Sequence, residues 1–92
     1  MPKNFQDIAD RLLRVRKILG LSQTEFARRA GIGVTTMNNW EGGDYRVSLN
    51  GALRLRETYG LPLDFIYCGN VDMLPNKIAS DLRLIPRESH SK

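Results

Sequence analysis

Two short helical signals separated by a glycine-containing turn occupy residues 20–43, which read GLSQTEFARRAGIGVTTMNNWEGG. The first helix is expected to begin at the capping box of residues 22–25, because a serine hydroxyl can cap the first turn and a glutamate three residues later can reach back. Residues 31–33, Gly-Ile-Gly, form the turn, and the second helix is expected from Val34 to Glu41. Two short helices joined by such a turn are typical of a helix-turn-helix unit.

The second helix of this unit has an apolar side and a small polar side. Met37 and Trp40 are three residues apart and are expected to face inward. The opposite side carries four small or medium side chains, which are Val34, Thr35, Asn38 and Asn39. A major groove about 12 Å wide admits one α-helix. A helix-turn-helix protein places its second helix there while the first crosses the phosphate backbone. The pattern therefore predicts a DNA-reading helix.

Apolar spacing on either side of this unit predicts further helices. Steps of three and four residues from Phe5 to Leu19 indicate a helix that begins after an Asn4 cap and stops at Gly20. Ser48 can cap another helix that runs to about Tyr59. Its expected apolar side is Leu49, Ala52, Leu53 and Tyr59, although Asn50 and Gly51 are poor helix formers. Because no convincing strand alternation occurs, the predicted fold class is all-α.

The end of the chain is expected to add one helix to a five-helix domain. Residues 4–69 should form the DNA-binding domain, and its last helix should span residues 63–68. Residues 70–86 should form a linker and a C-terminal helix that serves dimerisation or a partner, and residues 87–92 a mobile tail. The apolar residues nominated for a dimer interface are Leu63, Phe65, Ile66, Leu74, Ile78, Leu82 and Ile85.

Composition favours a DNA partner and argues against several other classes. The 92 residues carry a net charge of +4, and residues 1–56 hold ten basic and five acidic side chains. A basic region of this kind raises the expectation of a nucleic-acid partner. The longest apolar run, residues 65–68, is far shorter than the roughly 20 residues of a membrane helix, and the N-terminus has no apolar signal core. We therefore expect a cytoplasmic protein.

Residues with catalytic or metal-binding chemistry are scarce. The single cysteine, Cys68, excludes an internal disulfide and a cysteine-based zinc site. The single histidine, His90, lies near the end of the chain without a neighbouring partner in the sequence. Gly42 and Gly43 end a helix and do not form a phosphate loop. We expect no enzymatic activity, no cofactor and no metal.

The sequence resembles a known family. The run GLSQTEFARRAGI at residues 20–32, followed by WEGG at residues 40–43, is similar to the lambda-repressor/Cro-like (XRE) helix-turn-helix family. The resemblance continues through residues 48–49 and 59–64 and covers roughly residues 5–69. It implies a five-helix DNA-binding domain and a dimeric transcriptional regulator.

The resemblance also implies roles for single residues. Val34, Thr35 and Asn39 match base-reading positions, and Asn38 shares their face. Gln23 matches a glutamine that contacts a phosphate and braces the reading helix, and Arg16 and Glu41 match a structural ion pair. The expected backbone contacts to DNA are Gln23, Thr24, Thr36, Gly43, Tyr45 and Arg46.

Two positions depart from the family pattern. Gly33 stands where a Ser or Thr usually caps the reading helix, and glycine is tolerated there at a small cost. Arg56 stands where the family has a small residue facing the core. Arg56 must extend its charge to solvent or pair, or the fourth helix must be rotated.

Three functions remain open from the sequence. The first is a transcriptional repressor that binds palindromic double-stranded operator DNA as a homodimer. The second is the DNA-binding antitoxin of a toxin–antitoxin pair, whose C-terminal segment binds a protein partner such as the toxin; an antirepressor is another partner of this kind. The third is a helical interaction module that shows no salt-dependent DNA binding.

Overall fold

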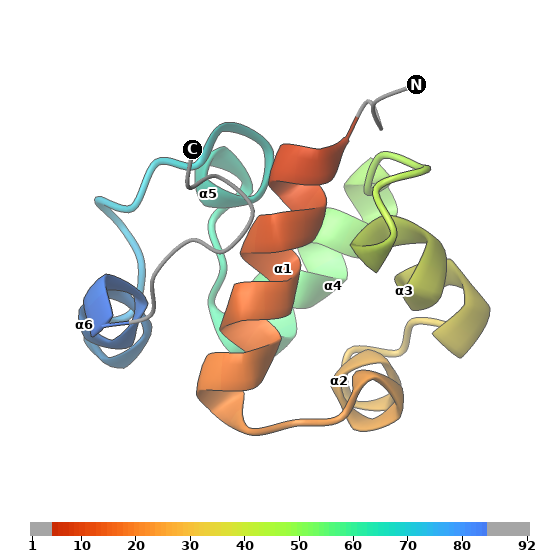
Figure 1. The fold of residues 1–92 in the computed structure, drawn as a ribbon, viewed down its shortest axis with the longest axis horizontal. Coiled ribbons are helices and arrows are strands. Elements are labelled where there is room, and N and C mark those ends of the chain that lie inside the picture. Colours follow the sequence, from red (N-terminus) through yellow and green to blue (C-terminus); the bar gives the residue numbers. More distant parts are fainter. Residues whose placement is uncertain (1–4, 85–92) are drawn as a thin grey trace.

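The computed structural model describes residues 5–84, which form six α-helices and no strand (Figure 1). The helices are α1 (Gln6–Leu19), α2 (Gln23–Arg29), α3 (Val34–Glu41), α4 (Leu49–Tyr59), α5 (Leu63–Cys68) and α6 (Asn76–Leu84). The predicted all-α class is confirmed. Asn4, Ile85 and the expected tail of residues 87–92 lie outside the described residues. None of the described helices is long and apolar enough to cross a membrane.

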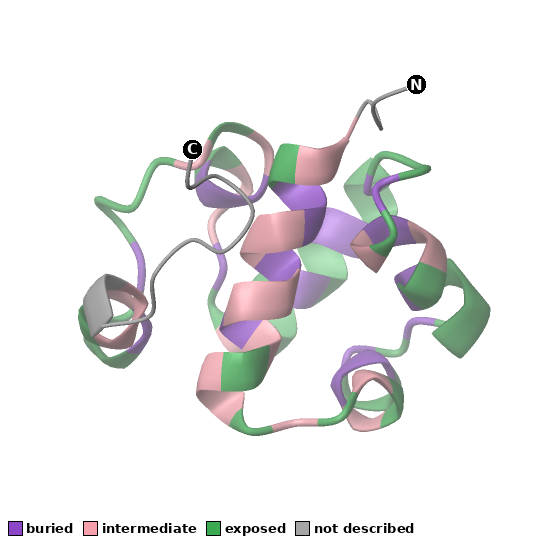
Figure 2. Cartoon of the chain, in the orientation of Figure 1, coloured by how far each residue is buried: buried purple, intermediate pink, exposed green. Residues whose placement is uncertain are grey.

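α1 runs through the middle of the molecule. α2 and α3 lie on one side of it, and α5 and α6 lie on the other (Figure 1). Leu12 and Val15 of α1 are fully buried, as are Phe26 of α2 and Ile66 of α5. Figure 2 shows buried residues on the inward sides of these helices. The five-helix unit and α6 therefore share one hydrophobic core.

Side-chain hydroxyl groups fix the beginnings of α2 and α4 as expected. Ser22 Oγ accepts a hydrogen bond from the backbone N–H of Glu25 at 3.1 Å, and Ser48 Oγ accepts one from the N–H of Gly51 at 3.0 Å. The second half of the predicted capping box does not form, because the carboxylate of Glu25 binds Arg28 and Arg29 instead.

The orientation of α4 differs from the prediction. Leu49 is 61% exposed and Leu53 is 38% exposed, whereas Ala52 and Leu55 are fully buried. The helix is rotated so that Leu55 enters the core, and this rotation leaves Arg56 exposed. The predicted apolar side of α4 is therefore wrong at Leu49 and Leu53, and Arg56 needs no buried partner.

Gly51 explains this rotation. A Cβ atom at position 51 would collide with the indole ring of Trp40. Glycine, although a poor helix former, lets α4 approach the reverse side of α3 closely enough to cover Trp40, which is 5% exposed.

We predict that Gly51→Ala lowers the free energy of unfolding by up to about 2 kcal/mol, measured by urea denaturation. Alanine gains about 1 kcal/mol of helix propensity over glycine, but overpacking against a rigid ring costs about 1–3 kcal/mol. Asn50→Ala is the matched control, because Asn50 is exposed on the same helix and should gain stability slightly. A Gly51→Ala protein more stable than the wild type would contradict the Trp40 packing.

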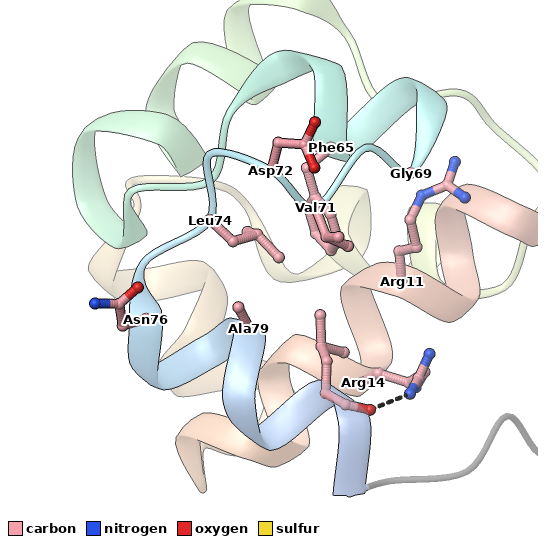
Figure 3. A pocket seen from close by; sticks show the side chains of 10 residues that line it. Arg11, Arg14, Phe65, Gly69, Val71, Asp72, Leu74, Asn76 and Ala79 are labelled. Atoms are coloured by element: carbon pink, nitrogen blue, oxygen red, sulfur yellow. Dashed lines mark hydrogen bonds between the residues drawn. The ribbon is translucent and has the colours of Figure 1, made fainter.

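The apolar stripe of α6 folds back onto its own domain. Leu74 and Ile78 are buried in the common core and Leu82 packs against it. The guanidinium of Arg14 in α1 donates a hydrogen bond to the carbonyl oxygen of Leu82 at 2.9 Å (Figure 3). α6 is therefore attached to α1 by both apolar and polar contacts.

This packing covers most of the residues nominated for a dimer interface. Phe65 and Ile66 of α5 are also buried, and Leu63 is half-buried. One copy of the chain already covers most of these side chains, so they are not available to a second copy in this fold.

We predict that Ile78→Ala lowers the free energy of unfolding by about 2–4 kcal/mol, because it leaves a cavity between α6 and α1. Met73→Ala should change stability by less than about 0.5 kcal/mol, since Met73 is 78% exposed. Thermal or urea unfolding of both variants is the measurement. Equal stability of the two variants would show that α6 does not belong to the core.

Candidate nucleic-acid interface

The outer face of α3 is open to solvent. Val34 is 43% exposed, and Thr35, Thr36 and Asn38 are exposed as well. Asn39 is half-buried at the edge of this face. On the opposite side, Met37 is fully buried and Trp40 nearly so. The structure thus brings the residues predicted to read bases together on one small, polar and uncharged face.

An ion pair anchors the C-terminal end of α3. Arg16 Nε lies 2.8 Å from Glu41 Oε2, and Arg16 Nη2 lies 3.1 Å from Glu41 Oε1. The side chains are 17% and 6% exposed, respectively. Arg16 Nη1 also donates to the carbonyl oxygen of Leu21 at 3.1 Å. Such a two-point contact fixes the direction of both side chains as well as their distance.

Gln23 joins this ion pair from the first turn of α2. Its Nε2 atom donates a hydrogen bond to Glu41 Oε1 at 3.0 Å. One carboxylate therefore holds residues from α1 and α2 against the end of α3. Thr24, the next residue of α2, is exposed beside Gln23.

The loop between α3 and α4 is held by contacts from both ends of the domain. The backbone N–H of Phe5 donates to the carbonyl oxygen of Gly43 at 3.3 Å. Tyr67 of α5 donates its hydroxyl hydrogen to the carbonyl oxygen of Val47 at 2.6 Å. Tyr45 is 59% exposed and Arg46 is exposed, so the fixed loop presents both of these side chains to solvent. Gly43, which was also expected to contact the DNA backbone, is buried.

Phe5 is a contact that the sequence did not reveal. The guanidinium carbon of Arg46 lies 5.7 Å from the centre of the Phe5 ring, within cation–π distance. The two residues are 41 positions apart, and an apolar residue at the start of a helix gives no sign of a distant cation. Phe5 restricts where the charge of Arg46 can lie.

The basic side chains of α2 are already engaged within the helix. The hydrogen bonds from Arg28 and Arg29 lower the pKa of Glu25 to about 2. The hydrogen bond between Arg28 and Glu25 also raises the pKa of Arg28. Glu25 remains ionised at neutral pH and offsets part of the charge of both arginines. Arg46 is therefore the better placed cation for a phosphate.

A cavity lies on the other side of α1, away from α3. It has a volume of about 520 Å³ between α1, the α5–α6 connection and α6 (Figure 3). Arg11, on its wall, donates from Nε and Nη2 to the carbonyl oxygens of Ile66 and Tyr67 at 3.3 and 3.2 Å. The residues that line the cavity belong to α1, α5, α6 and the α5–α6 connection. Since α5 and α6 lie on the opposite side of α1 from α3 (Figure 1), the cavity is not part of the candidate DNA surface.

Comparison with known families agrees with this geometry. A helix-turn-helix family model matches residues 12–66, more than half of the chain. The chain belongs to the XRE family of helix-turn-helix proteins. This XRE-family protein is accordingly a DNA-binding transcriptional regulator, and its family is not a family of enzymes. Searches of curated proteins and of solved structures found no match.

We predict that Arg16→Ala destabilises this XRE-family protein by roughly 3–5 kcal/mol, because it leaves the nearly buried carboxylate of Glu41 without its main partner. Thermal unfolding of Arg16→Ala, Glu41→Gln and the double variant gives the coupling energy between the two residues. Arg28→Ala is the control, since its ion pair is exposed and should leave the stability almost unchanged. Additive effects of the two single changes would contradict the anchoring role.

Proposed function

We propose that this regulator is a repressor that binds a palindromic operator as a homodimer, with α3 in the major groove. The observation that carries the proposal is the exposed face of Val34, Thr35 and Asn38. It lies on a helix whose opposite side is buried and whose end is fixed by Glu41. A fixed helix can read base edges because its side chains reach the groove in one defined orientation.

Two copies are proposed because one recognition helix contacts too few base pairs. A single helix of this kind reads about three to four base pairs, which recur at very many places in a genome. A two-fold symmetric dimer on two half-sites doubles the length of DNA that is read. Its two recognition helices then lie about one helical turn apart.

The chemistry of α3 favours half-sites that contain A·T pairs. No Arg or Lys lies between Val34 and Glu41, so the commonest contact to guanine is missing from this helix. An asparagine amide can donate to N7 of adenine and accept from its N6 amino group, and the methyl groups of Val34 and Thr35 suit the thymine methyl.

The antitoxin alternative loses the surface on which it rested. The sequence nominated the stripe of Leu74, Ile78, Leu82 and Ile85 for either self-association or a toxin, and Ile85 lies outside the described residues. In the fold, Leu74 and Ile78 are buried and Leu82 packs against the core. We therefore propose the repressor.

Selection of bound duplexes from random DNA tests the proposed function. We expect an enriched palindrome with A·T pairs in each half-site and half-site centres about 10 base pairs apart. The affinity for it should fall steeply with salt, with a slope of about −0.9 per contacted phosphate. Recovery of no common sequence, together with a flat salt response, would contradict the proposal.

We predict opposite effects for a base reader and a phosphate contact. Asn39→Ala should lose about 1–3 kcal/mol of discrimination at one position in each half-site and keep the salt slope. Arg46→Ala should weaken binding to all sequences alike and make the slope shallower by about one unit for each phosphate that is no longer neutralised. Titrations of selected and single-position variant duplexes at several salt concentrations measure both effects.

Thermal unfolding serves as the control for both variants, because Asn39 is half-buried and Arg46 contacts Phe5. If Asn39→Ala weakens binding to every sequence equally while its stability is unchanged, Asn39 does not read a base.

A further inference from the structure

The cavity between α1 and α6 combines an apolar wall with two cations. Its volume of about 520 Å³ lies within the range of about 300–1,000 Å³ that is common for small-molecule sites. The apolar residues that line it are Phe65, Val71, Leu74, Ala79 and Leu82. Figure 3 shows Leu74 and Ala79 on one side of the cavity and Arg11 and Arg14 on the other side, which belongs to α1.

Hydrogen bonds to the backbone hold both arginines in place. Arg11 donates to two carbonyl oxygens at the end of α5, and Arg14 donates to one in α6. The two arginines are three residues apart on α1 and therefore lie on the same face of that helix. Among the lining residues that the structure describes, the charged ones are these two arginines and Asp72. Cations thus outnumber carboxylates around the cavity, which favours an anion inside it.

The cavity has a buried floor and an open mouth. Phe65 and Leu74 are 2% and 6% exposed, whereas Val71 is 50% exposed. Asp72 and Asn76 at the same edge are exposed as well. A ligand from solvent can therefore enter beside the α5–α6 connection and reach the apolar floor without separating α6 from α1.

The matched family unit supplies only part of this cavity. Its lining residues from Gly69 to Leu82 lie beyond residues 12–66, which match the family model. Membership of the XRE family therefore gives no role to this cavity, and the argument for one rests on its residues alone.

We propose that the cavity binds a small organic acid with an apolar body. The carboxylate lies at the α1 side, because a guanidinium group gives a carboxylate planar, charge-assisted hydrogen bonds. The apolar body lies against Leu74 and Ala79, where it loses contact with water. This site is separate from the α3 face, so the inference does not depend on the repressor function.

NMR titration of the full chain with phenylbutyrate tests both parts of the proposed ligand. We expect saturable amide shifts in residues 11–14 and 71–79, and none in residues 34–39. Phenylbutyramide keeps the apolar body without the charge, and acetate keeps the charge without the body. Each of these two probes should bind at least about tenfold more weakly than phenylbutyrate.

Substitutions in the cavity wall test the location. Ala79→Leu extends an apolar side chain into the cavity and should prevent binding of phenylbutyrate. Arg11→Gln and Arg14→Gln should each weaken binding of the acid by at least about tenfold and change binding of the amide much less. Lys17→Gln is the matched control, because Lys17 is an exposed cation of the same helix outside the described lining. Thermal unfolding verifies that each variant is folded, and the two arginine variants are compared because Arg14 also holds α6.

Three results would overturn the site. The first is the absence of shifts at phenylbutyrate concentrations up to about 10 mM. The second is equal affinity for the acid and its amide. The third is unchanged binding to a folded Ala79→Leu protein. None of these experiments contains DNA, so each of these results leaves the repressor proposal intact.

Discussion

A helix of eight residues is not stable by itself in water, and this limit on α3 shapes the structure around it. The stability of α3 has to come from its neighbours, and these neighbours must leave one face free. Trp40 is covered by α4 at Gly51, and Glu41 is held by Arg16 and Gln23. All of these contacts act on the inner side or the C-terminal end of α3. The outer face, with Val34, Thr35 and Asn38, stays open to solvent.

α1 lies between α3 on one side and α5 and α6 on the other, and arginines of α1 contact both sides. On one side, Arg16 connects α1 to the end of α3. On the other, Arg11 and Arg14 donate to carbonyl oxygens at the C-terminal ends of α5 and α6, where cations also interact favourably with the helix dipole. The family match ends at residue 66, before α6 begins. α6 lies beyond the matched residues, packs against α1 in the common core and leaves the α3 face open.

The sequence predicted what depends on neighbouring residues and failed where distant residues decide. Ser22, Ser48 and the two faces of α3 were read correctly, because capping and helical periodicity act over three or four positions. In α4, periodicity allows either Leu49 and Leu53 or Leu55 to face inward. The choice depends on Trp40, because only glycine at position 51 leaves room for its indole ring against α4. Likewise, periodicity detects the apolar stripe of α6 but does not say that α1 covers it.

We propose that the outer face of α3 and the loop before α4 contact DNA and that α6 does not. Amide chemical-shift mapping by NMR during titration with the selected duplex tests it most directly. We expect the largest shifts on residues 34–39 and 44–46, with little change in residues 76–82. Shifts concentrated in α6 or around the cavity beside Arg11, with α3 unchanged, would contradict it.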